Sequence, residues 1–330
     1  MKILLNKEIE LNKWHSLLHI SNQSSPFQTP EFNDFFNSIN GFSSDVFAIE
    51  ENNEYKTIVV VTVQQEKGIK GYFSRRGIIF GGPLVVHEEK KYLQHLLKYI
   101  NEYYYKKLIY LETRNYFDYS SLSNQFTQSG FRYVPWLNFH LETSEVNSMK
   151  KSMSSSRLRQ IKKGIKNGAQ WKEAQSINDI NIFYNILSNL YKNKIKKPLL
   201  PKSFFLEFYK HKIGKYLLVY FEDKIIGGIM CPIKSEKAIY EFYVCGLDSE
   251  FKDQYPSVIA TWAAMEYANQ NNIPKFDFMG AGSPDDTYGV RDFKARFGGE
   301  LVEHGRYINI LNPLLYKTGV LGLKLLSKLK

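Results

Sequence analysis

The sequence predicts a mixed α/β protein made of two similar units, and three observations support this expectation. The chain has 330 residues, which at about 100–200 residues per domain is enough for two cores. Hydrophobic residues make up 43% and charged residues 23% of the chain, a balance that excludes wholesale disorder. Predicted strands and helices alternate, and their order in the first half recurs in the second.

In the first half, β-branched runs at residues 46–49 and 57–63 flank a turn-rich stretch and predict a hairpin. Apolar residues three and four apart then predict an amphipathic helix over residues 87–105. The other elements expected here are strands at residues 1–10, 108–111 and 136–141 and a helix over residues 119–129.

The second half repeats this order. Its expected elements are a hairpin at residues 215–221 and 224–231, strands at 238–244, 275–279 and 301–310, and helices at 256–271 and 290–297. A polar stretch rich in Ser and Lys at residues 144–156 reads as the link between the halves. We therefore expect domains at residues 1–147 and 148–310, with the tail 311–330 packing on the first.

The charge pattern leaves several partner classes open. A net charge of +11 permits phosphate-bearing partners without requiring them, and we expect no DNA. No apolar run reaches the roughly 18 residues of a membrane span, and the start lacks the pattern of a secretory signal. Cys231 and Cys245 match no disulfide framework or metal-ligand spacing, so we expect a cytoplasmic protein without a metal.

The most specific motif lies near the end of the chain. Residues 288–300 read YGVRDFKARFGGE, and residues 312–316 read NPLLY. A basic helix pattern, RLRQIKK, occupies residues 157–163, and residues 75–77 read RRG. With these motifs in this order, the chain resembles the Fem family of peptidoglycan-bridge aminoacyltransferases and their wider GNAT-like acyltransferase relatives.

That resemblance implies two tandem GNAT-like domains, each a mixed twisted sheet flanked by helices. It implies transfer of an aminoacyl group from a charged tRNA to an amine of a cell-wall or envelope precursor, without a cofactor. An N-acyltransferase that uses acyl-CoA or acyl carrier protein on an envelope sugar, lipid or peptide is the alternative. A non-catalytic binding module is a third reading, disfavoured by the intact segment around Lys294.

Three residues are expected to be catalytic. By resemblance, Lys294 stabilises the oxyanion that forms when an amine attacks an acyl ester, and Phe293 walls the pocket. Glu241 is the candidate proton acceptor. If Lys294 is an exposed residue of a cleft, Lys294→Met is expected to abolish transfer with little change in the melting temperature. The plainer reading is that Lys294 is a lysine on a helix surface.

Two sets of binding residues complete the expected site. The residues expected to contact the acceptor are Arg75, Arg76, Tyr240, Tyr243 and Arg291. The residues expected to contact tRNA or another donor are Arg157, Arg159, Lys162, Lys163 and Lys166. In this helix Leu158, Ile161 and Ile165 are expected to pack inward, and a merely solvated basic face is the plainer reading.

The chain departs from the family in two places. The family's long helical arm in the second domain is absent, because only residues 175–209 separate the basic helix from the next hairpin. Where bridge-forming relatives carry Q-x-x-x-W-x-x-x-K, this chain has Gln28, Phe32 and Phe36, so the lysine expected to hold the precursor's phosphate is absent. Ordinary acetyl-CoA enzymes of this fold bind the pyrophosphate with a Q/R-x-x-G-x-G/A loop at a helix start. Neither half of this chain shows that loop cleanly, which favours tRNA over acyl-CoA. The acidic pair at residues 285 and 286 reads as a turn, and orientation of the attacking amine is the alternative reading.

The C-terminal segment, residues 314–330, predicts a helix with two faces. Its leucines are expected to pack on the first domain. The lysines at positions 317, 324 and 328 share one face, and peripheral contact with anionic lipid at the inner face of the membrane is the sharper hypothesis for them.

Overall fold

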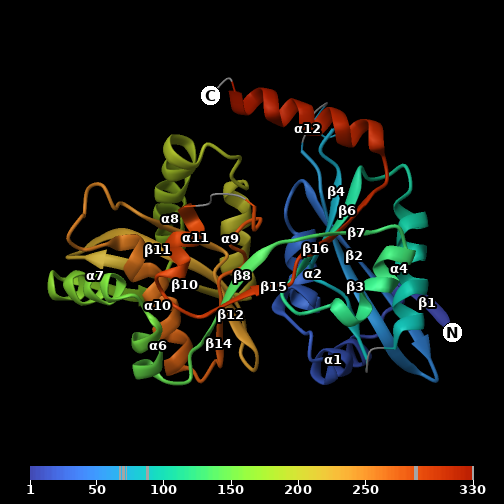
Figure 1. Ribbon diagram of the computed structural model, residues 1–330, viewed down its shortest axis with the longest axis horizontal. Coiled ribbons are helices and arrows are strands. Elements are labelled where there is room, and N and C mark those ends of the chain that lie inside the picture. Colours follow the sequence, from blue (N-terminus) through green and yellow to red (C-terminus); the bar gives the residue numbers. More distant parts are fainter. Residues whose placement is uncertain (67, 69–70, 72, 87–88, 286–288, 329–330) are drawn as a thin grey trace. The chain divides into compact units, whose positions relative to one another are not determined.

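The computed structural model describes the chain except residues 67, 69–70, 72, 87–88, 286–288 and 329–330, and side chains as far as residue 322. The chain divides into two compact units: unit 1 is Met1–Trp136 with Glu303–Lys330, and unit 2 is Leu137–Val302. Each unit contains a twisted sheet flanked by helices (Figure 1). The mixed α/β class expected from the sequence is confirmed.

Unit 1 is built on a sheet with the strand order β1-β2-β3-β4-β6-β16-β7, and β5 pairs with β3. Its strands are β1 Lys2–Leu5, β2 Phe42–Glu51, β3 Glu54–Gln64, β4 Arg76–Gly81, β5 Leu84–Val85, β6 Tyr110–Asn115, β7 Arg132–Val134 and β16 Arg306–Ile310. Its helical segments are η1 Asn6–Glu8, α1 Leu11–Ile20, η2 Pro26–Gln28, α2 Pro30–Asn37, α4 Lys90–Tyr104, η3 Ser120–Leu122, α5 Ser123–Gln128 and α12 Pro313–Lys328.

Unit 2 has the strand order β15-β8-β14-β12-β11-β10-β9, and β13 pairs with β11. Its strands are β8 Leu137–Glu142, β9 Ala169–Glu173, β10 Gly214–Phe221, β11 Lys224–Lys234, β12 Ala238–Tyr240, β13 Tyr243–Gly246, β14 Lys275–Asp277 and β15 Glu300–Glu303. Its helical segments are α6 Val146–Ser152, α7 Ser155–Lys166, α8 Ile177–Leu190, η4 Tyr191–Ile195, α9 Lys202–His211, α10 Pro256–Gln270 and α11 Gly289–Ala295.

The two sheets exchange one strand each. β16, from the end of the chain, lies between β6 and β7 in the sheet of unit 1. β8, from the end of the first half, lies in the sheet of unit 2, between β14 and β15. The expected boundary at residue 147 therefore lies too late: because β8 pairs with β14, unit 2 begins at Leu137, and unit 1 resumes at Glu303.

Two strands expected to be continuous are interrupted. The segment 301–310 forms β15 and β16, which belong to different sheets and are separated at Gly305, whose φ is +63°. The segment 238–244 forms β12 and β13, because the chain leaves the ladder at Glu241. The second interruption lies in the middle of the sheet of unit 2, beside Glu241, one of the expected site residues.

Helix α10 forms the centre of unit 2. Pro256 occupies its first turn, where the missing N–H costs nothing, after Tyr255 in the left-handed conformation. Every side chain from Val258 to Met265 is buried, and Trp262 is the largest of them. A helix buried on all sides is a rigid support for side chains that project from it.

The C-terminal helix α12 belongs to unit 1. Tyr316 packs edge-on against Tyr110 at 5.6 Å between ring centroids. Leu314 and Leu321, however, are 73% and 59% exposed, so the expectation that these leucines pack on the first domain is wrong. The side chains of Lys324 and Lys328 lie outside the described ones. None of the described helices combines the length and apolar character that a membrane span requires.

Candidate active site

The candidate site lies where two parallel strands of unit 2 diverge. β12 and β14 pair at only two positions, Ile239 with Phe276 and Tyr240 with Asp277. A last main-chain bond joins the Glu241 N–H to the Asp277 carbonyl at 2.9 Å. Beyond it, β13 pairs with β11, while β14 ends in a turn whose next residues have positive φ. Beyond the separation, the carbonyls of Phe278 and Gly280 accept from a side chain instead of from a neighbouring strand.

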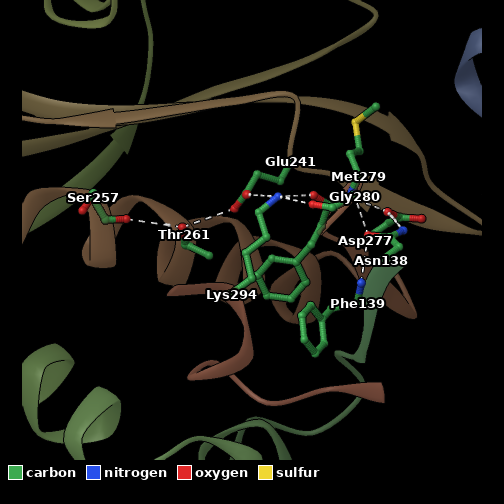
Figure 2. Close-up of polar contacts among 10 residues, drawn as sticks. Asn138, Phe139, Glu241, Ser257, Thr261, Asp277, Met279, Gly280 and Lys294 are labelled. Atoms are coloured by element: carbon green, nitrogen blue, oxygen red, sulfur yellow. Dashed lines mark hydrogen bonds and ion pairs between the residues drawn. The ribbon is translucent and has the colours of Figure 1, made fainter. Parts of the chain in front are cut away.

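The Lys294 ammonium lies at this divergence. Lys294 projects from α11, is only 8% exposed, and donates to the carbonyls of Phe278 at 2.5 Å and Gly280 at 3.0 Å. Its third neighbour is the Glu241 carboxylate, with Nζ to Oε1 at 3.0 Å (Figure 2). Since an ammonium has three donors, every N–H of Lys294 is used within the protein. The expectation of an exposed cleft lysine is therefore wrong.

Glu241 is buried opposite Lys294. Burial raises the pKa of its carboxyl above the usual value, and the Lys294 ammonium and the Thr261 hydroxyl oppose that rise. Thr261, on α10, lies 3.3 Å from Glu241 Oε2 and equally far from the Ser257 carbonyl. Figure 2 shows these groups as one continuous chain of contacts from α10 to the turn after β14.

A second carboxylate braces the turn that holds Lys294. Asp277 Oδ1 accepts from the Asn138 amide and the Met279 N–H, both at 2.7 Å, and Asn138 Oδ1 accepts from the Gly280 N–H at 2.7 Å. His140 Nε2 lies 3.1 Å from Asp277 Oδ2. Burial would raise the pKa of Asp277, but His140 and these hydrogen bonds outweigh it and lower the pKa below its usual value. The sequence interpretation missed Asn138, His140 and Asp277. The available signal was Asp277 itself, an acidic residue at the end of the short strand β14.

Arg291 and Phe293 support the site from outside the reacting groups. The Arg291 guanidinium, expected to contact the substrate, donates to the carbonyls of Ala281, Ser283 and Pro284 and so holds the loop that they form. The Phe293 ring packs on Phe297 at 5.4 Å and against the core of the unit. Tyr288 and Asp286 lie outside the described residues.

The basic helix α7 is rotated relative to the expectation. Its buried face consists of Arg157, Ile161 and Gly164, whereas Ile165 is exposed. The rotation has a steric cause: a Cβ at residue 164 would lie 2.6 Å from the Gln254 carbonyl, so only Gly permits this close approach.

Arg157 is therefore not a donor-binding residue. Its guanidinium lies 4.5 Å and 4.3 Å from the ring centroids of Phe293 and Phe297 and donates to the Phe293 carbonyl at 3.0 Å. Burial lowers its pKa to about 10. Arg157 thus fastens α7 to the motif that carries Lys294.

The other expected donor-binding residues lie at the surface of α7. Arg159, Lys162, Lys163 and Lys166 are exposed, and Lys163 pairs with Asp253 at 2.7 Å.

The two tyrosines beside Glu241 have different surroundings. Tyr240 is buried in β12. Tyr243, in β13, packs on Phe205 with ring centroids 5.1 Å apart and lies among the aromatic rings of α9. The interruption at Glu241 therefore separates residues that a continuous strand would have presented in alternation.

The expected residues of the first half belong to unit 1. Arg76 begins β4 and donates twice to Gln64 Oε1, at 3.0 and 2.9 Å. The carbonyl of Arg75 accepts from the Ile109 N–H. Phe36, at the position of the family's lysine, is buried and stacks on Phe80 at 5.7 Å.

The start of α10 carries its own anion. Asp248 Oδ1 accepts from the Ser257 N–H at 3.1 Å and from the Ser257 hydroxyl at 2.9 Å. Helix N-termini attract anions because their first N–H groups are unpaired. Here a carboxylate of the chain occupies that place. Within the described part of the chain, no group of acidic, His or Cys side chains is arranged to hold a metal ion.

Comparisons with known proteins concern the fold and the segment that contains this site. The sequence model of the FemAB family matches residues 226–321, the segment that contains Glu241 and Lys294. No curated protein matches the sequence. Among solved structures, FemX is similar over 96% of this chain and 99% of its own, with a TM-score of 0.75 and 14% identity.

Two other solved structures are also similar to this chain. A tandem GNAT protein from the clavulanic acid biosynthesis pathway matches 94% of this chain and 99% of its own (TM-score 0.61, 7% identity). The C-terminal domain of a putative lysylphosphatidylglycerol synthetase from Agrobacterium fabrum matches 96% of each chain (TM-score 0.59, 11% identity). The chain thus has the tandem GNAT-like fold along nearly its whole length and resembles the FemAB family over residues 226–321.

Proposed function

We propose that this protein is an aminoacyltransferase that moves an aminoacyl group from a charged tRNA to an amine of a cell-wall or envelope precursor. The observation that carries the proposal is the buried Lys294 ammonium, held between two carbonyls and Glu241 at the divergence of β12 and β14. This group lies within the segment that matches the FemAB family, and the fold of the whole chain is similar to that of FemX.

The proposed chemistry uses Glu241 and Lys294 together. The acceptor amine attacks the ester carbonyl carbon and a C–N bond forms; the amine proton passes to Glu241, whose pKa burial raises. A protonated Glu241 attracts Lys294 less, which frees one N–H of the ammonium for the oxyanion. The C–O bond to the tRNA then breaks, and the proton returns to the leaving hydroxyl.

The start of α10 supports tRNA over acyl-CoA as the donor. In GNAT-type enzymes that use acetyl-CoA, the pyrophosphate binds at a helix start, and here Asp248 already occupies that start. A carboxylate in this place repels a pyrophosphate. An N-acyltransferase that uses acyl-CoA or acyl carrier protein remains the second candidate, because AcCoA is named together with the similar tandem GNAT protein, whose structure was determined without it.

A paired set of variants tests the catalytic role. Lys294→Met alone leaves Glu241 buried without its cation, so lost activity could reflect lost folding. The double variant Lys294→Met with Glu241→Gln removes both charges and keeps the volume similar. We expect it to fold and to transfer at least on the order of a hundredfold more slowly, the effect of losing an oxyanion donor.

Transfer is measured with radiolabelled aminoacyl-tRNA and a nucleotide-linked muropeptide, with Lys202→Met, an exposed lysine of α9, as the control. A folded double variant with wild-type activity would overturn the proposal.

A second experiment tests the donor. If tRNA lies across the exposed face of α7, Lys162, Lys163 and Lys166 changed to Glu should weaken tRNA binding by orders of magnitude while sparing the fold. Filter binding at two salt concentrations measures the affinity for tRNA, and calorimetry measures the affinity for acyl-CoAs. Weak, salt-insensitive tRNA binding together with micromolar acyl-CoA binding favours the second candidate.

The proposed donor and acceptor place the protein in the cytoplasm, at the inner face of the membrane when the precursor is lipid-linked. The exposed Leu314 and Leu321 of α12 would support peripheral contact with anionic lipid. Vesicle sedimentation tests this contact. Binding to anionic liposomes no stronger than to neutral ones at low salt removes the membrane role.

A further inference from the structure

Three arginines lie on one face of the sheet of unit 1. In register, Arg76 of β4 lies beside Tyr110 of β6, and Arg306 of β16 lies opposite Arg114 of β6. Glu112 stands between them on β6, two residues from Arg114 and on the same face, because side chains alternate along a strand. Helix α4 packs against the other face, where Leu111 is buried.

The Glu112 carboxylate pairs with two of these three guanidiniums. Glu112 Oε1 accepts from Arg114 Nε at 2.9 Å and from Arg306 Nη1 at 3.1 Å. Arg76 instead donates to the neutral amide of Gln64. Among the described residues, Arg114 Nη1 and Nη2 and Arg306 Nη2 have no hydrogen-bond partner. The cluster therefore keeps an excess positive charge and unused donors.

Aromatic rings fix the orientation of two of these guanidiniums. Arg306 lies 3.7 Å from the ring centroid of Trp136, and Arg114 lies 5.3 Å from that of Phe80. The side chains of Arg114, Arg306 and Glu112 are 34%, 22% and 12% exposed. A guanidinium packed on a ring keeps its in-plane N–H groups available for hydrogen bonds. Partial burial strengthens the electrostatic attraction between these groups and a bound anion.

The electrostatics of the cluster agree with this excess. Burial and the neighbouring Arg114 lower the pKa of Arg306 to about 10. Burial would raise the pKa of Glu112, but Arg114, Arg306 and Arg76 together lower it below its usual value. Glu112 is thus fully ionised at neutral pH and still leaves the cluster with more positive than negative charge.

We propose that Arg76, Arg114 and Arg306 form a binding site for an oxyanion group, a phosphate or a carboxylate, of a small-molecule ligand of unit 1. Planar guanidiniums bind such groups through paired N–H donors, which a lysine cannot reproduce. The site consists of residues of unit 1 alone and includes neither Lys294 nor Glu241, so a failure of this proposal and a failure of the proposed transfer chemistry can be told apart.

Calorimetry with inorganic pyrophosphate and with citrate at low salt tests this site, the two probes separating phosphate from carboxylate recognition. We expect saturable 1:1 binding of at least one probe. Arg306→Gln and Arg114→Gln should each weaken it by about tenfold or more, and Arg306→Lys should also weaken it although the charge remains. Glu112→Gln should strengthen it, since the competing carboxylate is gone.

Lys98→Gln is the matched control, because Lys98 is an exposed cation of α4, on the other side of the same sheet. Circular dichroism melts confirm that each variant is folded. The proposal is overturned if the wild-type protein binds neither probe at millimolar concentration, or if Lys98→Gln weakens binding as much as Arg306→Gln. A purely structural ion pair predicts the first of these results.

Discussion

The charged clusters of the two units differ in how completely their charges are satisfied. In unit 2, Lys294 and Glu241 are both buried, and every N–H of the ammonium has an acceptor. In unit 1, Arg114 and Arg306 share the single carboxylate of Glu112 and remain partly exposed, with unused donors.

This difference matches the two proposed roles, transfer chemistry in unit 2 and ligand binding in unit 1. A closed cluster stabilises its charges mutually and must rearrange before it can act on a substrate. An open cluster can bind a ligand without rearranging, because its donors already face solvent. Removing one charge should therefore cost much more folding free energy in unit 2 than in unit 1.

The largest effect is expected at Lys294. Lys294→Met leaves the Glu241 carboxylate buried without its cation, and such changes cost about 3–5 kcal/mol. Urea unfolding measures the loss, and adding Glu241→Gln should recover more than half of it. A melting temperature within a few degrees of the wild type for Lys294→Met alone would contradict a closed cluster.

Asp277 should give the next largest effect, with a distinctive pH dependence. Its pKa is lowered from 3.8 in the folded protein, so its carboxylate contributes stability above that value and loses it as the pH falls through the lower, folded pKa. We expect Asp277→Asn to cost about 2 kcal/mol at pH 7, the scale of hydrogen bonds to a charged group. Below pH 4 the gap between wild type and variant should narrow; a constant gap down to pH 2 would be evidence against this assignment.

A matched pair on α7 should show a smaller difference. Arg157→Met removes the hydrogen bond to the Phe293 carbonyl and the contacts with two rings, at a cost of about 2 kcal/mol. Arg159→Met, two residues away and exposed, should change stability by less than about 0.5 kcal/mol. Equal effects in thermal unfolding would mean that Arg157 is as dispensable for folding as an ordinary surface arginine.

Local patterns predicted local structure well. The hairpin of β2 and β3 and the helices α4 and α10 follow from periodicity and turn residues, which act within a few residues. The exchange of β8 and β16 between the sheets could not be predicted in this way. These two strands pair with β14 and β6, which lie more than a hundred residues away along the chain.

The candidate site was predicted in part for a similar reason. Lys294 and Glu241 were identified, and the structure brings them together. Asn138, Thr261 and Asp277 were not, because they come from three separate elements and share no motif. Arg157 was assigned to the surface because of its charge. Gly164, seven residues later on the same helix face, was the signal that this face is buried.

The smallest effect is expected at Lys163, and it tests whether burial or distance decides the strength of an ion pair. Lys163 and Asp253 lie 2.7 Å apart, closer than Lys294 and Glu241 at 3.0 Å, but their side chains are 50% and 64% exposed. Solvent screens such a pair, so Lys163→Gln should cost less than about 0.5 kcal/mol in urea unfolding. Raising the salt concentration should leave that small difference near zero. A loss that approaches the one for Lys294→Met would show that separation outweighs burial in this protein, and the contrast between closed and open clusters would then lose its physical basis.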